Sequence, residues 1–293
     1  MKTLITGGSG FLGSALALHL HATGSDVALL LRHASRLDRL HGLEAAMDVG
    51  RCNTDADVET FVRRIQPDVV IHTACTYGRH GEGLLQISDT NVRLGLQILQ
   101  SLLHTGKPVT FINTGSALAP DVSLYALTKH QFAQLGRSLT CQTGSQLRFV
   151  NVLLEHMYGP GDDTTKFTTH VLHTCHRNDP ELKLTAGEQR RDFIHIDDVV
   201  TAYSILVERR DELESNLAIE VGSGIAPTVR EFVETAHRLI GSTTKLRFGA
   251  LPYRENEAMH CQADITRMIQ LGWKPVYDLE TGLKKTIEME LIK

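Results

Sequence analysis

The sequence predicts an α/β protein, with a doubly wound parallel sheet followed by a smaller mixed α/β part. Over roughly the first 155 residues, short apolar runs alternate with amphipathic stretches of about ten to fifteen residues, as in βαβ units. A glycine-rich turn lies between the first apolar run and the first amphipathic stretch. Beyond residue 155 the alternation loosens, and helix-like stretches are separated by loops that contain Gly and Pro.

Each expected element follows from its pattern of apolar residues. Strands are expected at residues 1–6, 26–31, 69–71, 108–112 and 146–154, which are short and rich in apolar residues. Helices are expected at residues 12–20, 58–65, 91–103, 167–177, 197–209 and 229–240, where apolar side chains recur with helical spacing.

The composition excludes several other classes of protein. Of the 293 residues, 42% are hydrophobic and 22% charged, which is typical of globular proteins. No apolar run approaches the roughly 18–20 residues that span a bilayer. The net charge of −4 provides no basic surface for a nucleic acid. The five cysteines show no C-x-x-C spacing and the N-terminus shows no signal peptide, so we expect a cytoplasmic protein without a metal site.

The glycine-rich turn predicts a dinucleotide site. Gly7, Gly10 and Gly13 have the spacing G-x-x-G-x-x-G, and Ser9, Phe11 and Leu12 belong to the same turn. Glycines let the backbone approach a pyrophosphate, and the N-terminus of the following helix directs its positive dipole at that anion. We therefore predict a Rossmann domain that binds a nicotinamide dinucleotide.

The residues after the second strand favour NADP(H). An NAD site usually has an acidic residue there that binds the ribose 2′-hydroxyl. This chain has Arg32, Ser35 and Arg36 instead, and the two cations would neutralise a 2′-phosphate. NAD remains the alternative, with the two arginines as solvated loop residues.

Tyr125 and Lys129 are the predicted catalytic pair. Their i, i+4 spacing places them on one face of a helix. A free tyrosine has a pKa of about 10. We expect the Lys129 ammonium and an oxidised nicotinamide to favour the phenolate and so lower the pKa of Tyr125.

Motifs along nearly the whole chain resemble those of the extended short-chain dehydrogenase/reductases, the NAD-dependent epimerase/dehydratase family of nucleotide-sugar epimerases, dehydratases and 4-ketoreductases. The motifs lie at residues 6–13, 48–49, 71–74, 91, 116, 125, 129, 158–161, 191–199, 221–224 and 271–275.

The resemblance implies a role for each matching residue. Ser116 would bind the substrate's C4 oxygen, Tyr125 would exchange a proton with it, and Lys129 would support Tyr125 and the nicotinamide ribose. Further cofactor contacts are implied for Asp48, Val49, Thr73, Ala74, Cys75, Asn91 and Thr114. Substrate contacts are implied for Tyr77, Arg79, Ser116, His156, Lys166, Phe167, Arg191, Arg254 and Glu257, with the two arginines suited to a diphosphate.

The same resemblance suggests how the chain is organised. Residues 1–157 with 193–223 would form the NADP-binding domain, and residues 158–192 with 224–293 the nucleotide-sugar domain. A homodimer would form through the helices at 91–103 and 129–139.

Two departures from the family pattern narrow the function. Sugar 4,6-dehydratases have an Asp-Glu pair directly after the active-site hydroxyl, whereas Ser116 is followed by Ala117-Leu118. His156 stands where the family usually has a substrate-contacting Asn. The segments at 75–80, 123–125, 154–159, 164–167 and 189–193 are similar to bacterial CDP-paratose and CDP-abequose synthases.

We therefore predict NADPH-dependent reduction of the C4 keto group of a nucleotide-linked 4-keto-6-deoxy or 3,6-dideoxy sugar. Such a product would serve a surface polysaccharide such as O-antigen, or a glycosylated metabolite. A nucleotide-sugar 4-epimerase with bound NAD and a non-catalytic NADP(H)-binding protein remain the alternatives.

Overall fold

The structure, a computed structural model, describes residues 1–141, 146–255 and 257–291 and divides the chain into two compact units. The first unit comprises Met1–Leu153 and Tyr203–Ile219, and the second comprises Leu154–Ala202 and Glu220–Lys293. These crossing points differ from the predicted boundaries at 157, 193 and 223, and the functional assignment of the two parts stays a prediction.

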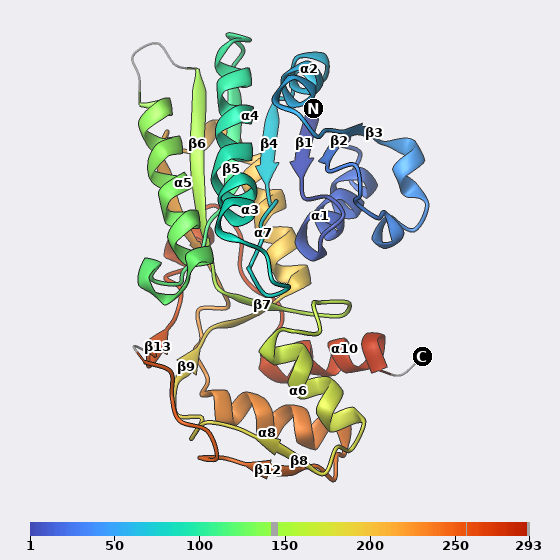
Figure 1. Cartoon of the computed structure of the whole chain (residues 1–293), viewed down its shortest axis with the longest axis vertical. Coiled ribbons are helices and arrows are strands. Elements are labelled where there is room, and N and C mark those ends of the chain that lie inside the picture. The colour runs from blue at the N-terminus through green and yellow to red at the C-terminus, as the bar shows by residue number, and fades with distance from the viewer. Residues whose placement is uncertain (142–145, 256, 292–293) are drawn as a thin grey trace. The chain divides into compact units, whose positions relative to one another are not determined.

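A central sheet organises the first unit (Figure 1). In the described residues it has seven strands in the order β11-β6-β5-β4-β1-β2-β3. All neighbouring strands from β6 to β3 are parallel. The first three strands are added toward one edge of the sheet and the next three toward the other, so the strand order reverses between β1 and β4. The strands are β1 (Lys2–Thr6), β2 (Asp26–Leu31), β3 (Asp48–Arg51), β4 (Val69–His72), β5 (Val109–Thr114), β6 (Leu147–Leu154) and β11 (Leu217–Val221).

Helices cover both faces of this sheet because the strands are apolar on both sides. One face packs against α2 (Asp55–Ile65), α4 (Leu94–Leu103) and α5 (Leu124–Thr140) through a core that includes Phe61, Phe111 and Phe132. The other face carries α1 (Phe11–Ala22) and the C-terminal end of α7 (Ile196–Glu208), where His19 bonds Ser204 at 3.1 Å. The shorter helices are η1 (Asp38–Leu40), η2 (Leu43–Ala46), α3 (Leu84–Ser88), η3 (Asp89–Arg93), η4 (Pro120–Val122) and η5 (Arg210–Glu212).

The second unit is built on three helices that share an apolar core. Phe232 on α8 (Val229–Ile240), Leu172 on α6 (Phe167–His176) and Leu283 on α10 (Leu279–Leu291) belong to this core. Three short parallel pairs accompany them, namely β7 (His156–Tyr158) with β10 (Phe193–His195), β8 (Glu181–Lys183) with β12 (Lys245–Arg247), and β9 (Arg190–Arg191) with β13 (His260–Cys261). Helix α9 (Thr266–Gln270) completes the unit.

The expected elements are present, and one helix begins differently. α8 spans residues 229–240 as predicted, because Thr228 and Glu231 form a capping box and Gly241, at φ 68°, ends the helix. The helix predicted at 91–103 instead begins with the wide π-helical turn η3, which precedes α4. No helix in the described residues is long and apolar enough to cross a membrane.

Candidate active site

The glycine turn after β1 brings strand and helix into close contact. Gly7 has a φ of 68°, and its carbonyl accepts a 2.8 Å hydrogen bond from the Gly10 amide. A Cβ at Gly13 would overlap the Gly7 carbonyl oxygen, so only glycine fits there. In the described structure no side chain caps the first amides of α1, and its first turn has no acidic residue. Those amides therefore suit an anion. Ser9 and Phe11 are half-buried in this turn, and Leu12 is buried.

The loop after β2 is exposed, and an arginine from the neighbouring strand holds its backbone. Arg32 and Arg36 are both exposed, and Arg36 forms a 2.7 Å ion pair with Asp38. Nη1 of Arg51, at the end of β3, donates to the carbonyls of His33 at 2.7 Å and Ser35 at 3.0 Å. Arg51 is not among the residues predicted from the sequence. No strand was predicted at residues 48–51, so nothing local in the sequence placed this arginine beside the predicted cofactor loop.

The first residue of β3 already has charged partners. Asp48 pairs with Arg64 at 3.0 Å and with Lys2 at 3.7 Å, and Val49 beside it is half-buried. A contact between this segment and an adenine stays a prediction.

Hydrogen bonds fix the chain just after β4 against the end of β1. Thr73 Oγ1 donates to the Thr6 carbonyl at 2.7 Å, and the Ala74 amide donates to Thr6 Oγ1 at 3.2 Å. Thr6 Oγ1 also lies 2.8 Å from His72 Nδ1. The carboxyl ends of these two strands are therefore rigidly connected beside the glycine turn.

Asn91 joins this segment to α5, the helix that carries the predicted catalytic pair. Its side chain is fully buried in η3 and accepts from the Thr76 amide at 2.7 Å. Its Nδ2 donates to the Thr76 carbonyl at 3.0 Å and to Thr128 Oγ1 at 2.9 Å. Asn91 thus positions the segment after β4 relative to α5, and its amide bonds protein groups.

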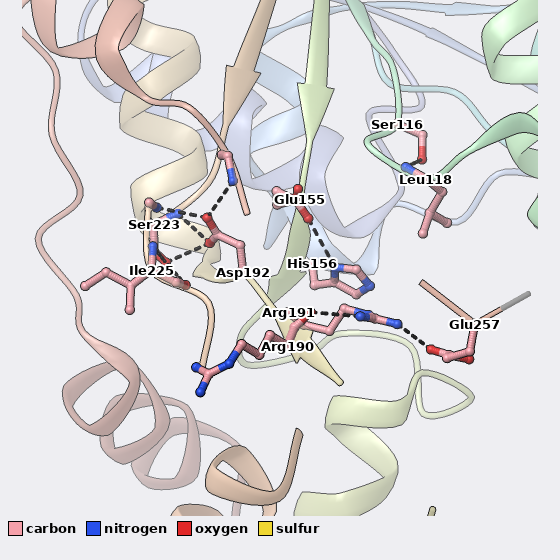
Figure 2. Close-up of polar contacts among 12 residues, drawn as sticks. Ser116, Leu118, Glu155, His156, Arg190, Arg191, Asp192, Ser223, Ile225 and Glu257 are labelled. Carbon is pink, nitrogen blue, oxygen red and sulfur yellow. Dashed lines mark hydrogen bonds and ion pairs between the residues drawn. The ribbon is translucent and has the colours of Figure 1, made fainter. Parts of the chain in front are cut away.

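Ser116 and Thr114 lie at the end of β5. Ser116 is 6% exposed, and its Oγ accepts from the Leu118 amide at 3.2 Å (Figure 2). Thr114 Oγ1 accepts from the Tyr203 hydroxyl at 2.7 Å. The Ser116 hydroxyl retains its own hydrogen to donate, since Leu118 supplies the hydrogen in their bond.

Tyr125 lies in the first turn of α5 within a stack of three side chains. Helix α5 begins there because Ser123 caps the Ala126 amide at 3.2 Å. The Tyr77 ring stacks on the Tyr125 ring, with centroids 4.4 Å apart. The Arg79 guanidinium lies 4.9 Å from the Tyr77 centroid. The structure therefore brings the predicted substrate residues Tyr77 and Arg79 to the predicted catalytic tyrosine.

The pKa of Tyr125 shifts in the opposite direction from the expected one. Burial raises the pKa of Tyr125 well above its ordinary value, and the nearby Cys75 adds to the effect. Cys75 and Tyr125 also raise the pKa of Tyr77. Burial lowers the pKa of Lys129. Desolvation disfavours the charged form of both groups and raises the pKa of Tyr125 in the protein alone, and the expected lowering by Lys129 together with an oxidised nicotinamide stays a prediction.

Lys129 supplies the observation that tests whether a cofactor fits. It is 1% exposed, and in the described residues its Nζ has no hydrogen-bond partner. A buried donor without an acceptor is costly and calls for an explanation. The hydroxyls of a nicotinamide ribose would supply the acceptors. With the N-terminus of α1, which no side chain caps in the described residues, Lys129 makes the first unit compatible with a dinucleotide.

The second unit brings together residues predicted to bind the substrate. Arg191 is 8% exposed, forms an ion pair with Glu257, and donates to its neighbour's carbonyl at 2.8 Å (Figure 2). Nδ1 of His156 lies 3.3 Å from Oε2 of the adjacent Glu155, whose side chain is 5% exposed. Burial raises the pKa of Cys261, with Arg191 lowering it and both glutamates raising it. The two charged pairs therefore converge around Cys261.

A buried carboxylate fixes the backbone behind Arg191. Asp192 is fully buried, and its Oδ1 accepts from the Ser223 amide at 2.6 Å and the Ser223 hydroxyl at 2.7 Å. Its Oδ2 accepts from the amides of Gly224 at 2.9 Å and Ala263 at 3.2 Å. Asp192 thereby links three segments of the second unit that are distant in sequence.

The remaining predicted substrate residues have separate surroundings. Lys166 pairs at 2.9 Å with Asp162, whose side chain is 1% exposed. Phe167 is 41% exposed at the start of α6, and Arg254 is exposed in the loop before β13. Their contact with a substrate stays a prediction.

Comparison with known proteins identifies the family. The model of the NAD dependent epimerase/dehydratase family matches residues 3–222. The chain belongs to this family. It is therefore an enzyme of that family, and the predicted family and Rossmann-type fold are confirmed.

Individual relatives match over nearly the full length. A CDP-abequose synthase of Salmonella typhimurium strain LT2 is 31% identical, with 97% of each chain covered. GDP-L-fucose synthase 1 of Arabidopsis thaliana is 24% identical, covering 99% of this chain and 93% of the relative. A UDP-glucose-4-epimerase from Stenotrophomonas maltophila, solved with bound NAD, has a TM-score of 0.87 at 20% identity over 99% of this chain and 97% of that one. That structural likeness shows the shared fold.

Proposed function

We propose that this enzyme reduces the C4 keto group of a nucleotide-linked 4-keto-6-deoxy or 3,6-dideoxy sugar with NADPH. The observation that carries the proposal is the site around Ser116, Tyr125 and Lys129, where Ala117 and Leu118 provide no acid or base for eliminating water. The similarity to a CDP-abequose synthase over 97% of the chain supports a nucleotide-sugar substrate.

The site would move a proton from Tyr125 to the substrate. Burial raises the pKa of Tyr125, so its phenol is protonated at neutral pH and can act as the proton donor. Ser116 would donate its hydroxyl hydrogen to the same C4 oxygen and hold the ketone in place. Reduction then needs no prior ionisation of Tyr125, in contrast to oxidation of an alcohol.

The first unit would bind NADP(H), which supplies the hydride for the C4 carbon. The glycine turn and the N-terminus of α1 would hold the pyrophosphate, and Lys129 Nζ would bind the nicotinamide ribose. Arg32 and Arg36 would neutralise the 2′-phosphate, with Arg36 exchanging its exposed Asp38 partner for it.

The second unit would bind the nucleotide diphosphate. The Arg191 guanidinium can bind two phosphate oxygens at once. Glu257, which forms an ion pair with Arg191 in this structure, would turn to a ribose hydroxyl. His156 and its buried partner Glu155 would contribute a further polar contact to the sugar or diphosphate.

A spectrophotometric assay tests the proposal. The enzyme is incubated with NADPH and a panel of CDP-, dTDP-, GDP- and UDP-linked 4-keto sugars, and the absorbance at about 340 nm is followed. We expect stoichiometric loss of NADPH with at least one substrate, and product analysis should show a new C4 hydroxyl. No loss of absorbance with any of them would overturn the proposal.

A second candidate is a nucleotide-sugar 4-epimerase with bound NAD. A dTDP-L-rhamnose 4-epimerase of Burkholderia thailandensis is 25% identical over 96% of this chain, which favours this candidate. An epimerase returns the hydride to its substrate, so it would copurify with NAD and interconvert sugars without net cofactor use. Mass spectrometry of the cofactor released from the purified protein distinguishes the two candidates.

A further inference from the structure

Arg51 occupies a position from which it shapes the cofactor loop. In the parallel pairing of β2 with β3, Arg51 is the register partner of Leu31. It therefore ends β3 beside the point where the chain leaves β2 and enters residues 32–36, here called the basic loop. Its guanidinium comes from a strand that follows the basic loop in sequence by about 15 residues, so local sequence around the loop does not reveal it.

One nitrogen of Arg51 donates hydrogen bonds to the backbone carbonyls of the basic loop. Nη1 donates to His33 at 2.7 Å, to Ser35 at 3.0 Å and to Arg32 at 3.5 Å. The Ser35 amide closes the loop by donating to the Arg32 carbonyl at 3.0 Å. The loop also receives support from Asn53, whose Oδ1 accepts from the His33 amide at 3.4 Å.

This arrangement determines the shape of the basic loop. The loop contains Arg32 and Arg36, whose exposed side chains carry the charge. Long exposed side chains lose conformational entropy when they bind an anion, so a backbone fixed in advance reduces the cost of binding. A single cationic nitrogen at the end of the Arg51 side chain makes all three contacts with the loop carbonyls.

We infer that Arg51 is the positioning residue that gives this enzyme its preference for a 2′-phosphorylated dinucleotide. It acts by holding the carbonyls of Arg32, His33 and Ser35, so that the basic loop is already formed when the 2′-phosphate arrives. The inference rests on the proposed use of NADPH. It adds that a residue outside the basic loop determines the preference for the 2′-phosphate.

The test compares two adenosine ligands that differ by a single phosphate. Isothermal titration measures binding of 2′,5′-ADP and of 5′-ADP to the full-length wild type, R51K, R51Q and R63Q. Arg63 is a matched control because it is an exposed arginine on α2, paired with Glu59 at 2.7 Å. We expect R51Q to weaken 2′,5′-ADP binding about tenfold, with 5′-ADP changed less than about twofold.

The conservative variant and steady-state kinetics add independent readouts. R51K keeps a cationic N–H donor on a shorter side chain, so we expect it to restore part of the preference. The KM for NADPH should rise in R51Q while kcat and the KM for NADH stay within about twofold. Unchanged 5′-ADP binding also shows that each variant is folded.

The outcomes separate this inference from the proposed function. A wild type that prefers 2′,5′-ADP, together with an R51Q that matches R63Q, would overturn the role of Arg51 alone. Equal losses for both ligands in R51Q and R51K would also overturn it, since Arg51 would then only maintain the fold. A wild type without any preference would refute both the NADPH assignment and the role of Arg51. Failure to reduce ketosugars would count against the reaction and leave the binding result valid.

Discussion

Replacing Lys129 with methionine should make the cofactor-free protein more stable and much less active. The Lys129 side chain is 1% exposed, and its Nζ has no hydrogen-bond partner in the described residues. A buried polar group left without a partner costs about 1–3 kcal/mol. Methionine has a similar length and no polar hydrogen, so K129M should raise the free energy of unfolding by about that amount. For a protein of this size each kcal/mol raises Tm by about 2–4 °C.

The stability gain of K129M should decrease as the pH rises. Burial lowers the pKa of Lys129 in the folded protein below its value of about 10.4 in the unfolded chain. Between those two values the unfolded chain binds more protons, so wild-type stability rises with pH through this window. The advantage of K129M should therefore be largest at neutral pH and should shrink as the pH approaches about 10.

Two assays check this prediction. Urea unfolding at several pH values gives the stability difference, with K284M as the control because Lys284 is exposed on α10 and its loss should change little. Ketosugar reduction should show kcat of K129M lower by at least about 10²-fold. The reasoning is refuted if K129M is less stable than the wild type at neutral pH, or if its advantage grows with pH.

Three further substitutions probe other parts of the site. Y125F should lower kcat by about 10²–10⁴-fold in the reductase assay while circular dichroism stays unchanged, since only the proton donor is removed; retained turnover would show another donor. D192N replaces one of the two accepting oxygens of a buried carboxylate with an NH2 group, which would face N–H and O–H donors. Part of the lost stability is offset because the neutral amide avoids the cost of burying a charge, the same burial that raises the pKa of Asp192. Unfolding stability should fall by about 2–4 kcal/mol, whereas D211N, at an exposed aspartate, should change little; an unchanged urea midpoint would contradict the role of the four bonds of Asp192. R191K should raise the KM for the nucleotide sugar about tenfold and leave the KM for NADPH unchanged, because lysine loses the paired contact with a diphosphate; equal changes in both KM values would argue for a structural role.

Much of the first unit could be predicted from the sequence because its signals are local. The spacing of the glycines at 7, 10 and 13 between a strand and a helix indicates a tight turn. The structure explains Gly13, because a Cβ there would overlap the Gly7 carbonyl oxygen. The spacing of Tyr125 and Lys129 places both on α5, which begins at Leu124 because Ser123 caps it. These inferences needed only the period of a helix and the chemistry of a turn.

The contacts between segments distant in sequence could not be predicted in this way. The amide of Asn91 bonds Thr76 and Thr128, so it joins segments of the protein where the resemblance suggested a cofactor contact. The buried partner of His156 is Glu155, an adjacent residue whose importance depends on its burial. Neither result is visible without knowing which side chains are removed from water.

The sequence by itself determined the α/β class, the glycine turn, the placement of Tyr125 and Lys129 on one helix, and the family, because each depends on residues a few positions apart or on motifs in a fixed order. Only the tertiary structure decided the electrostatics of the site. It placed the half-buried Tyr125 beside Cys75 and Tyr77, and desolvation of the Tyr125 phenol raises its pKa rather than lowering it. It also brought Arg51 against the basic loop through the pairing of β2 with β3. The physical reason is that desolvation and hydrogen bonding depend on distances in space, which the fold sets between residues far apart in the chain.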